Sequence, residues 1–347
     1  MQKGLENAGF TVNEDLTKFY AELEFERINA GPLTGFQPDL HLYEAGIDQY
    51  PAELLEGAKA FSDTAVVFIA RPGGEASDLV TNMGTLDGDE GRHMLEITSK
   101  EEDLLAMAKE NFEHVVVLIN AANTMELGFA DEEGVDAVLW IGDPGKTGFE
   151  SVGKVLSGEI NPSGAVVDTF AYDATSAPSF ANFGDFRYSD SEDAFYVEYA
   201  EGIYVGYRYY ETRYVDNETG ECDEAAYREA VQYPFGYGLS YTEFSQEIKS
   251  FKTDAEKVSM EVEVTNTGDT AGKDIVQVYY TAPYEEGRVE KSHVVLGAFD
   301  KTELLEAGGA QTITLEIPIE EMASHLQIWQ DWIMRMKNGM NFWNSCQ

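Results

Sequence analysis

The stretch Ala65–Asp78, with the sequence AVVFIARPGGEASD, decides the fold and holds the first candidate for chemistry. Its first six residues are apolar, and such a short run predicts a strand buried on both faces of a parallel sheet. Arg71–Gly74 ends the strand, because proline has no backbone donor and the glycines allow turn dihedrals. Glu75 follows directly, at the carboxyl end of the strand, where open α/β sheets carry their functional groups.

The composition limits the class of protein and of ligand. The 347 residues are enough for two domains, and 43% hydrophobic residues predict that most of the chain folds. The formal net charge of -41 comes from 64 acidic and 23 basic residues, and it argues against nucleic acid, anionic membranes and acidic substrates as partners. A strongly solvated acidic surface is the simplest cause of this charge, and neutral ligands stay open.

The cysteines, histidines and apolar runs give no sign of a metal centre or a membrane anchor. Cys222 and Cys346 stand in no metal-ligand spacing and the five histidines are scattered, so we expect no metal and no cofactor. No apolar run in the sequence reaches membrane-spanning length. The first residues show an amphipathic pattern rather than a signal peptide, so a cytoplasmic protein is expected.

Helix and strand patterns alternate over the first half of the chain. The amino-terminal residues predict a helix, a turn at Gly9 and a second helix capped by Asn13. Further helices are expected over 48–61, 101–112 (capped by Ser99) and 147–157, and strands over 65–70, 114–119, 137–141 and 165–169. Helices that alternate with short apolar strands predict a mostly parallel sheet with flanking helices, an α/β sandwich.

The pattern changes after this layer. From 172 to 243 tyrosine and phenylalanine accumulate and helical spacing fades, which predicts a long irregular segment. From Phe244 the period becomes two, and the strands expected over 258–264, 273–280, 294–299 and 312–319 are typical of a small all-β sandwich. We therefore predict an α/β domain with its aromatic-rich connecting segment over 1–243, a β-sandwich over 244–324, and an atypical tail over 325–347.

Three further motifs allow both a functional and a structural interpretation. The loop Gly142–Thr147 suggests a phosphate-binding turn, but Trp140 stands where a P-loop needs glycine, so a tight strand-to-helix turn is favoured. Asn120, Asn123 and Glu126 follow a strand and could hold a ligand, although buried amides usually satisfy backbone groups. The tyrosines after residue 172 could stack on sugar rings, but such side chains more often belong to the core.

Glu75 and Asp78 form a pair of carboxylates in one loop. Two carboxylates can perform acid/base chemistry when their surroundings separate their pKa values. A solvated turn explains the same two residues equally well. The residues alone leave this question open.

The chain also contains four distinctive strings: PGGEASDL at 72–79, PGKTGFESVGKVLSGEINPSG at 144–164, YPFGYGLSYTEF at 233–244 and VTNTGDTAGKDIVQVYY at 264–280. Together they resemble glycoside hydrolase family 3, the β-glucosidase family, and the resemblance covers about 5–324. The third and fourth strings are long and specific. The fourth resembles the opening of the family's fibronectin type III-like domain.

The resemblance implies a larger enzyme with a TIM barrel that carries an aspartate nucleophile, an α/β sandwich that carries the acid/base, and a fibronectin type III-like domain. This chain shows the last two, its amino end is expected to lie inside the sandwich domain, and nothing in it matches the nucleophile motif. Glu75 matches the general acid/base, and Asp78 is assigned to substrate binding. Ala76 and Leu79 depart from the glycine and arginine that are usual there.

The function implied is retaining hydrolysis of terminal β-D-glycosides. The chain lacks the nucleophile and is expected to be inactive alone. Its expected partners are a neutral glucoside or oligosaccharide and the missing barrel, and the surface left open by that barrel predicts a homo-oligomer. The alternative is a non-catalytic carbohydrate-binding or assembly module.

Overall fold

The computed structural model describes residues 1–24, 42, 44–73, 79–85, 89–182, 186–190, 195–216, 219–285, 287–328 and 331–335. They form two compact units, Met1–Ile160 and Asn161–Gln347, and each is described by itself. The second unit includes the aromatic-rich segment. The domain boundary expected at 243/244 stays a prediction.

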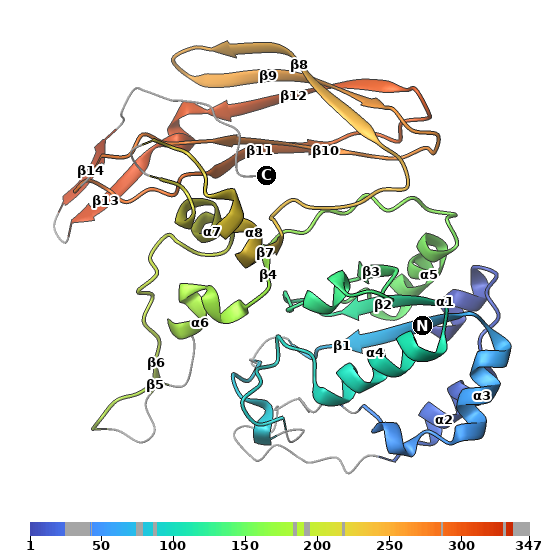
Figure 1. Cartoon of the computed structure of the whole chain (residues 1–347). Helices are drawn as coiled ribbons and strands as arrows, with labels where there is room; N and C mark the ends of the chain where they lie inside the picture. Colours follow the sequence, from blue (N-terminus) through green and yellow to red (C-terminus); the bar gives the residue numbers. More distant parts are fainter. Residues whose placement is uncertain are drawn as a thin grey trace. The chain divides into compact units, whose positions relative to one another are not determined.

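The first unit contains a parallel sheet with helices around it (Figure 1). The strands β1 (Thr64–Ala70), β2 (His114–Asn120) and β3 (Ala137–Trp140) lie in the order β1-β2-β3. The helices are α1 (Gln2–Asn7), α2 (Glu14–Glu22), α3 (Ala52–Phe61), α4 (Ser99–Asn111) and α5 (Gly145–Leu156). The mostly parallel α/β layer predicted from the sequence is therefore confirmed. The prediction that its first strand is buried on both faces is wrong, because Val66 and Phe68 are 44% and 37% exposed on one face of β1.

The helix starts follow local side-chain chemistry. Asn13 caps α2 as predicted, because its Oδ1 accepts hydrogen bonds at 3.0 Å from two backbone N–H groups of the first turn. The predicted cap Ser99 is wrong, because Thr98 caps α4 and Ser99 is already helical. The Thr98 hydroxyl accepts from the Glu101 N–H, while the Glu101 carboxylate accepts from the Thr98 N–H. This reciprocal capping box outcompetes a single serine cap.

The helices of the first unit pack through apolar and small residues. Leu104, Leu105 and Ala108 are the buried apolar residues of α4, which contacts β1 and β2. Helix α1 packs against α5, where Gly4 lies directly on the backbone of Phe149. A Cβ on Gly4 would collide with the Phe149 carbonyl oxygen, so only glycine permits this close approach.

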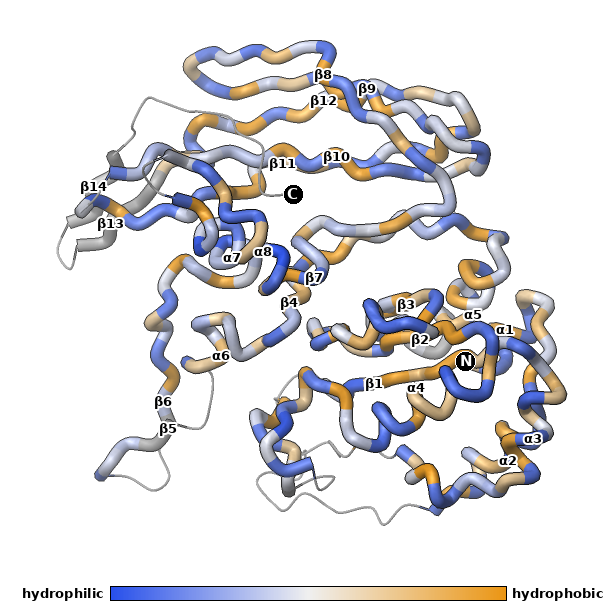
Figure 2. The backbone as a smooth tube through the Cα atoms, in the orientation of Figure 1, coloured by the Kyte–Doolittle hydropathy of each residue, from blue (hydrophilic) through white to orange (hydrophobic). Residues whose placement is uncertain are grey.

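The second unit is mainly antiparallel. One sheet has the order β12-β9-β8, formed by β8 (Phe244–Thr253), β9 (Lys257–Asn266) and β12 (Ala310–Pro318), and β10 (Ile275–Tyr280) pairs with β11 (Val295–Lys301). Figure 2 shows hydrophilic and hydrophobic residues alternating along these strands. The inward residues form one core: Val258, Met260, Val262, Val264, Val276, Val278, Leu305, Ile313, Leu315 and Ile317. The predicted small β-sandwich is confirmed, with β8 as an additional, largely exposed strand.

The aromatic-rich segment has more regular structure than predicted. Its helices are α6 (Pro178–Asn182), α7 (Tyr207–Arg213) and α8 (Glu224–Ala230). Short antiparallel pairs join β4 (Phe170–Ala171) to β7 (Val231–Tyr233) and β5 (Phe186–Arg187) to β6 (Phe195–Tyr196). Tyr210 and Tyr227 are buried, as the core interpretation expects, whereas Tyr199 is exposed.

The strand predicted over 165–169 is wrong, because these residues form no strand. Val166 instead exchanges two 2.8 Å backbone hydrogen bonds with the turn at Gly236 and Tyr237. The neighbouring Val167 is 74% exposed, so the apolar run does not mark a buried strand. Apolar residues that contact a turn from another part of the chain cannot be distinguished from a strand by pattern alone.

Asparagines in two of the distinctive strings hold the loops of the second unit together. The Asn161 Oδ1 accepts from the Ser240 hydroxyl at 2.9 Å and from the Tyr241 N–H at 2.7 Å. Asn266 is fully buried, and its Nδ2 donates to the carbonyls of Thr270 and Leu305, both at 2.9 Å. These residue types are therefore needed as side-chain connectors between loops far apart in sequence.

The tail that fitted no pattern contains a hairpin. The strands β13 (Ser324–Ile328) and β14 (Asp331–Arg335) pair antiparallel, and 336–347 lie outside the described residues. Nowhere in the described ranges is there a helix long and apolar enough to cross a lipid bilayer.

Candidate functional site

The carboxyl ends of the three parallel strands lie at one edge of the sheet. β1 ends at Ala70, β2 at Asn120 and β3 at Trp140, and β1 and β2 are in register over their whole length. In open α/β sheets this edge is where ligands bind, because the loops that follow the strands converge there. The described residues of these loops therefore define the candidate site.

Arg71, the first residue after β1, is a buried clamp. Its side chain has no exposed surface, and it pairs with the Glu101 carboxylate through two parallel hydrogen bonds of 2.8 and 2.7 Å. Nε donates to the Met94 carbonyl at 2.8 Å and Nη2 to the Glu96 carbonyl at 2.6 Å. Arg71 thus ties the end of β1 to the segment around Met94–Glu96 and to the start of α4. A planar guanidinium suits this task, because its donors form a rigid fork.

Glu75 and Asp78, the residues predicted for catalysis and substrate binding, lie outside the described residues. The structure describes the chain up to Gly73 and again from Leu79. Both roles therefore stay predictions. Arg71 precedes this loop, and its side chain binds the segment Met94–Glu96.

Three side chains meet at this edge: His93, Glu96 and Glu126. The His93 Nε2 lies 3.5 Å from the Glu96 Oε2 and 3.3 Å from the Glu126 Oε1. The sequence analysis singled out Glu126 but neither His93 nor Glu96, because scattered histidines carry no spacing signal. Backbone contacts join the two segments, since the Glu126 N–H donates to the Leu95 carbonyl at 2.8 Å.

The other residues named with Glu126 have separate surroundings. The Asn123 side chain donates to the Thr124 carbonyl at 2.6 Å, which is the local backbone role that the structural interpretation expects. The Oδ1 of Asn120 is buried, and no hydrogen-bond partner for it occurs among the described residues. Of these two amides, only Asn120 has a side-chain oxygen that could accept a further hydrogen bond, and it lies at the end of β2.

The loop Gly142–Thr147 is a tight strand-to-helix turn. Gly142 and Gly145 adopt positive φ angles of 60° and 66°, a backbone conformation that favours glycine. Helix α5 begins at Gly145, two residues earlier than predicted. This geometry supports the structural interpretation over the phosphate-binding one.

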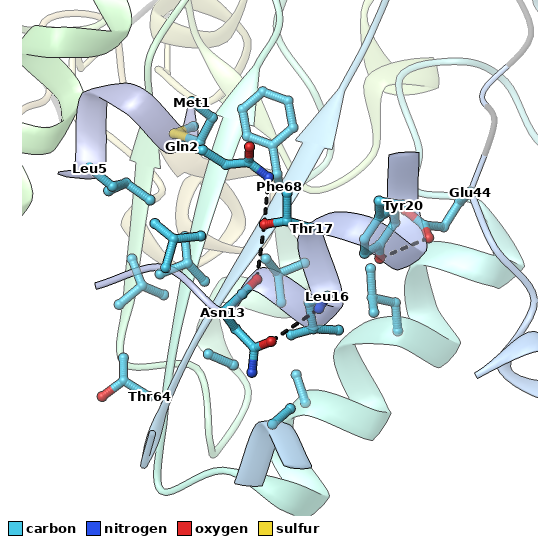
Figure 3. Close-up of a pocket in the computed structure, with 18 of the residues that line it drawn as sticks. Met1, Gln2, Leu5, Asn13, Leu16, Thr17, Tyr20, Glu44, Thr64 and Phe68 are labelled. Atoms are coloured by element: carbon cyan, nitrogen blue, oxygen red, sulfur yellow. Dashed lines mark hydrogen bonds between the residues drawn. The ribbon is translucent and has the colours of Figure 1, made fainter. Parts of the chain in front are cut away.

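The first unit also contains a cavity of about 1210 Å³, which Figure 3 shows in close-up. Residues of α1, α2, α3, β1 and α4 line it, and most of the lining is apolar. One group of its polar side chains is hydrogen-bonded internally: the Gln2 amide donates to Thr17 at 2.8 Å, and the Thr17 hydroxyl donates to the Asn13 carbonyl at 2.9 Å.

A second polar group on the cavity wall consists of two tyrosines and a glutamate. The hydroxyls of Tyr20 and Tyr50 lie 2.5 Å apart, and both donate to the Glu44 Oε1, at 3.3 and 3.4 Å. Burial raises the pKa of the Glu44 carboxyl and, together with the nearby Glu44 charge, raises the pKa of Tyr50 to about 12. Sugar sites need convergent polar groups that are free to bind hydroxyls. The wall formed by these tyrosines and Glu44 is therefore a poor sugar site. Asn120, whose Oδ1 has no partner among the described residues, also lines the cavity.

Known protein families match both the α/β part and the β-sandwich part of the chain. The family model described as glycosyl hydrolase family 3 C-terminal domain matches residues 13–207, and the fibronectin type III-like domain model matches residues 274–338. A β-glucosidase of Ruminococcus albus is 36% identical over 323 residues, which cover 93% of this chain and 30% of that protein. β-Glucosidase A of Butyrivibrio fibrisolvens is 33% identical, with 91% of this chain and 38% of that protein covered.

Solved structures give the same match. A β-glucosidase from Paenibacillus barengoltzii has a TM-score of 0.73 and 31% sequence identity, and the match covers 97% of this chain and 36% of that one. The fold and the matches define the domain described as glycosyl hydrolase family 3 C-terminal domain, together with a fibronectin type III-like domain. Because the first family model covers more than half of the residues, the chain belongs to glycoside hydrolase family 3. It spans about a third of the length of the relatives it matches.

Proposed function

We propose that this chain carries the general acid/base of a retaining β-glucosidase, with Glu75 in that role and Asp78 at the substrate. A TIM barrel outside these 347 residues supplies the aspartate nucleophile, so the chain alone does not turn over glycosides. Family membership supports the class of reaction. The net charge of -41 favours a neutral glycoside over an anionic substrate.

The Arg71 clamp is the structural observation that supports this assignment. A catalytic carboxylate must be held within a fraction of an ångström of its productive position. The loop with Glu75 starts three residues after Arg71, whose side chain is fixed by Ala70, Met94, Glu96 and Glu101. The clamp therefore fixes the chain just before the loop that carries Glu75.

The proposed chemistry has two steps. First, the nucleophile attacks the anomeric carbon while Glu75 donates its proton to the leaving oxygen, so the glycosidic C–O bond breaks and a glycosyl–enzyme bond forms. Next, the Glu75 carboxylate takes a proton from water, whose oxygen attacks the anomeric carbon and releases the nucleophile. The two carboxyl groups must stand about 5–5.5 Å apart in such a mechanism.

The test uses the enzyme in which this chain is joined to its barrel. Glu75→Ala should lower kcat/KM by about 10²–10⁴-fold for glucosides with poor leaving groups, because these need protonation. Aryl glucosides with good leaving groups should lose far less in the first step. Added azide should restore turnover of the second step, since it attacks without a general base, and should yield the β-glycosyl azide.

Glu56→Ala is the matched control, because the Glu56 side chain is 73% exposed on α3 and should be dispensable. An equal loss on all substrates without azide rescue would show that Glu75 is structural, and Asp78→Ala would be tested next. No loss on any substrate would favour the alternative, a non-catalytic carbohydrate-binding module. Turnover of an aryl β-glucoside by the 347-residue chain alone would contradict the external nucleophile.

A further inference from the structure

The cluster of His93, Glu96 and Glu126 has the composition and spacing of a metal site. Its three candidate ligand atoms all lie within 4.8 Å of one another. The His93 side chain is only 8% exposed, and those of Glu96 and Glu126 are 30% and 19% exposed. We infer that these three residues bind a divalent first-row transition ion, with zinc as the best fit, at the carboxyl edge of the parallel sheet.

The distances support this inference. Zinc binds imidazole nitrogen and carboxylate oxygen at about 2.0–2.2 Å in tetrahedral geometry, which places neighbouring ligand atoms about 3.3–3.5 Å apart. The two distances from the His93 Nε2, 3.3 and 3.5 Å, already have this value. The Glu96 Oε2 also accepts from the His93 backbone N–H at 2.8 Å, which holds this carboxylate beside the imidazole.

The ligand chemistry selects the class of ion. One imidazole nitrogen and two carboxylate oxygens are a common ligand set for a divalent cation, and the two carboxylates balance its charge. Imidazole suits zinc and its neighbours, whereas magnesium and calcium prefer oxygen ligands alone. Three protein ligands leave a fourth position for water.

The site would join two loops that follow different strands. His93 and Glu96 belong to the segment just before α4, where the Glu96 N–H donates to the His93 carbonyl at 3.0 Å. Glu126 belongs to the loop after β2, and its N–H donates to Leu95 at 2.8 Å. The ion would fix the same segment that Arg71 holds through Met94 and Glu96. This role goes beyond the proposed hydrolase chemistry and does not depend on Glu75.

The test is titration of the metal-stripped 347-residue chain with zinc chloride by isothermal calorimetry. One equivalent should bind with a Kd in the micromolar range or tighter, and His93→Gln and Glu126→Gln should each weaken binding at least tenfold. Cobalt(II) bound at the same site should give the intense visible absorption of tetrahedral coordination. Magnesium and calcium should bind at least a hundredfold more weakly than zinc.

The matched control is His114→Gln. His114 also faces a carboxylate, at 3.5 Å from Asp136, but the pair is about half exposed and has no third ligand within the described residues. This variant should bind zinc like the parent chain. Far-UV circular dichroism of every variant checks folding, and Glu126→Gln alone carries the test if His93→Gln unfolds.

Three outcomes would overturn the proposal. They are the absence of zinc binding below millimolar concentration, unchanged zinc binding by Glu126→Gln, and calcium binding as strong as zinc binding. Each would show that the cluster is an ordinary ion-pair network. 

Discussion

The parallel sheet and the β-sandwich of this chain differ in how well they cover their apolar faces. In the sandwich, Val264 is fully buried and Ile317 is 2% exposed. In β1 of the parallel sheet, Val66 is 44% and Phe68 is 37% exposed, and both line the cavity of about 1210 Å³. The sandwich therefore closes its own core, whereas the described part of the parallel layer does not.

The difference follows from how the two kinds of sheet find partners. Antiparallel strands such as β8 and β9 are neighbours in sequence and pair through a short turn. Parallel strands need partners from distant segments, and within the described residues β1 pairs with β2 alone. The first unit accordingly depends on specific anchors such as the Arg71 clamp more than the sandwich does.

The largest expected effect tests that dependence. Arg71→Leu should destabilise the first unit by about 3–5 kcal/mol, because it removes the charge partner of the buried Glu101 carboxylate and the donors to the carbonyls of Met94 and Glu96. The control Arg92→Leu removes a partly exposed pair with Glu102 and should cost less than about 1 kcal/mol. Hydrogen exchange read by mass spectrometry measures the two units separately. Equal losses in the two variants would contradict the anchoring role.

A smaller effect should separate the two cores. Ile317→Ala should cost the second unit about 2–5 kcal/mol, because it opens a void in a closed core. Phe68→Ala should cost the first unit less than about 1.5 kcal/mol, because the ring already borders a cavity and is partly exposed. Urea unfolding followed by circular dichroism and hydrogen exchange gives both values. A larger loss for Phe68→Ala would mean that the cavity is filled in solution.

The smallest effect concerns a buried carboxyl of the second unit. Burial raises the pKa of Glu211, while the hydrogen bond from Tyr227 at 2.5 Å partly opposes this. A raised folded-state pKa favours the protonated form, so stability is highest below the unfolded pKa of about 4.5 and falls as the pH rises through the folded value. Glu211→Gln cannot ionise, so its stability relative to the parent should increase over this range.

The expected gain at neutral pH is about 1–3 kcal/mol, the cost of a buried polar group that is not satisfied. Melting temperatures of both proteins between pH 4 and 8 give the measurement. Glu224→Gln is the control, because Glu224 is 68% exposed on α8 and should show no such trend. If Glu211→Gln instead loses stability relative to the parent as the pH rises, the pKa of Glu211 is not raised in the folded state.

Much of the fold could be predicted because its signals are local. The apolar run of β1, the Asn13 cap and the period-two strand β9 each depend on neighbouring residues, and the structure has all three. The misassigned residues 165–169 form backbone hydrogen bonds with a distant turn, and most residues of the unpredicted β8 are exposed to solvent. Their local pattern therefore carries little information.

The candidate site divides in the same way. Glu75 could be proposed from its place after a strand and from the resemblance to a family, and its role stays a prediction. Arg71 appeared in the sequence only as the first residue of a strand-ending turn. Its partners Met94, Glu96 and Glu101 lie 23 to 30 positions away, beyond the reach of any spacing argument.

The sequence by itself determined the alternation of helices and strands, the change to a period of two after residue 243, and the family to which the chain belongs. Only the tertiary structure decided that Arg71 is a buried clamp and that His93 meets Glu96 and Glu126. The physical reason is that hydrophobic periodicity is read along the chain. A buried charge instead pairs with a residue that can be distant in the sequence, and only folding brings that partner within hydrogen-bond distance.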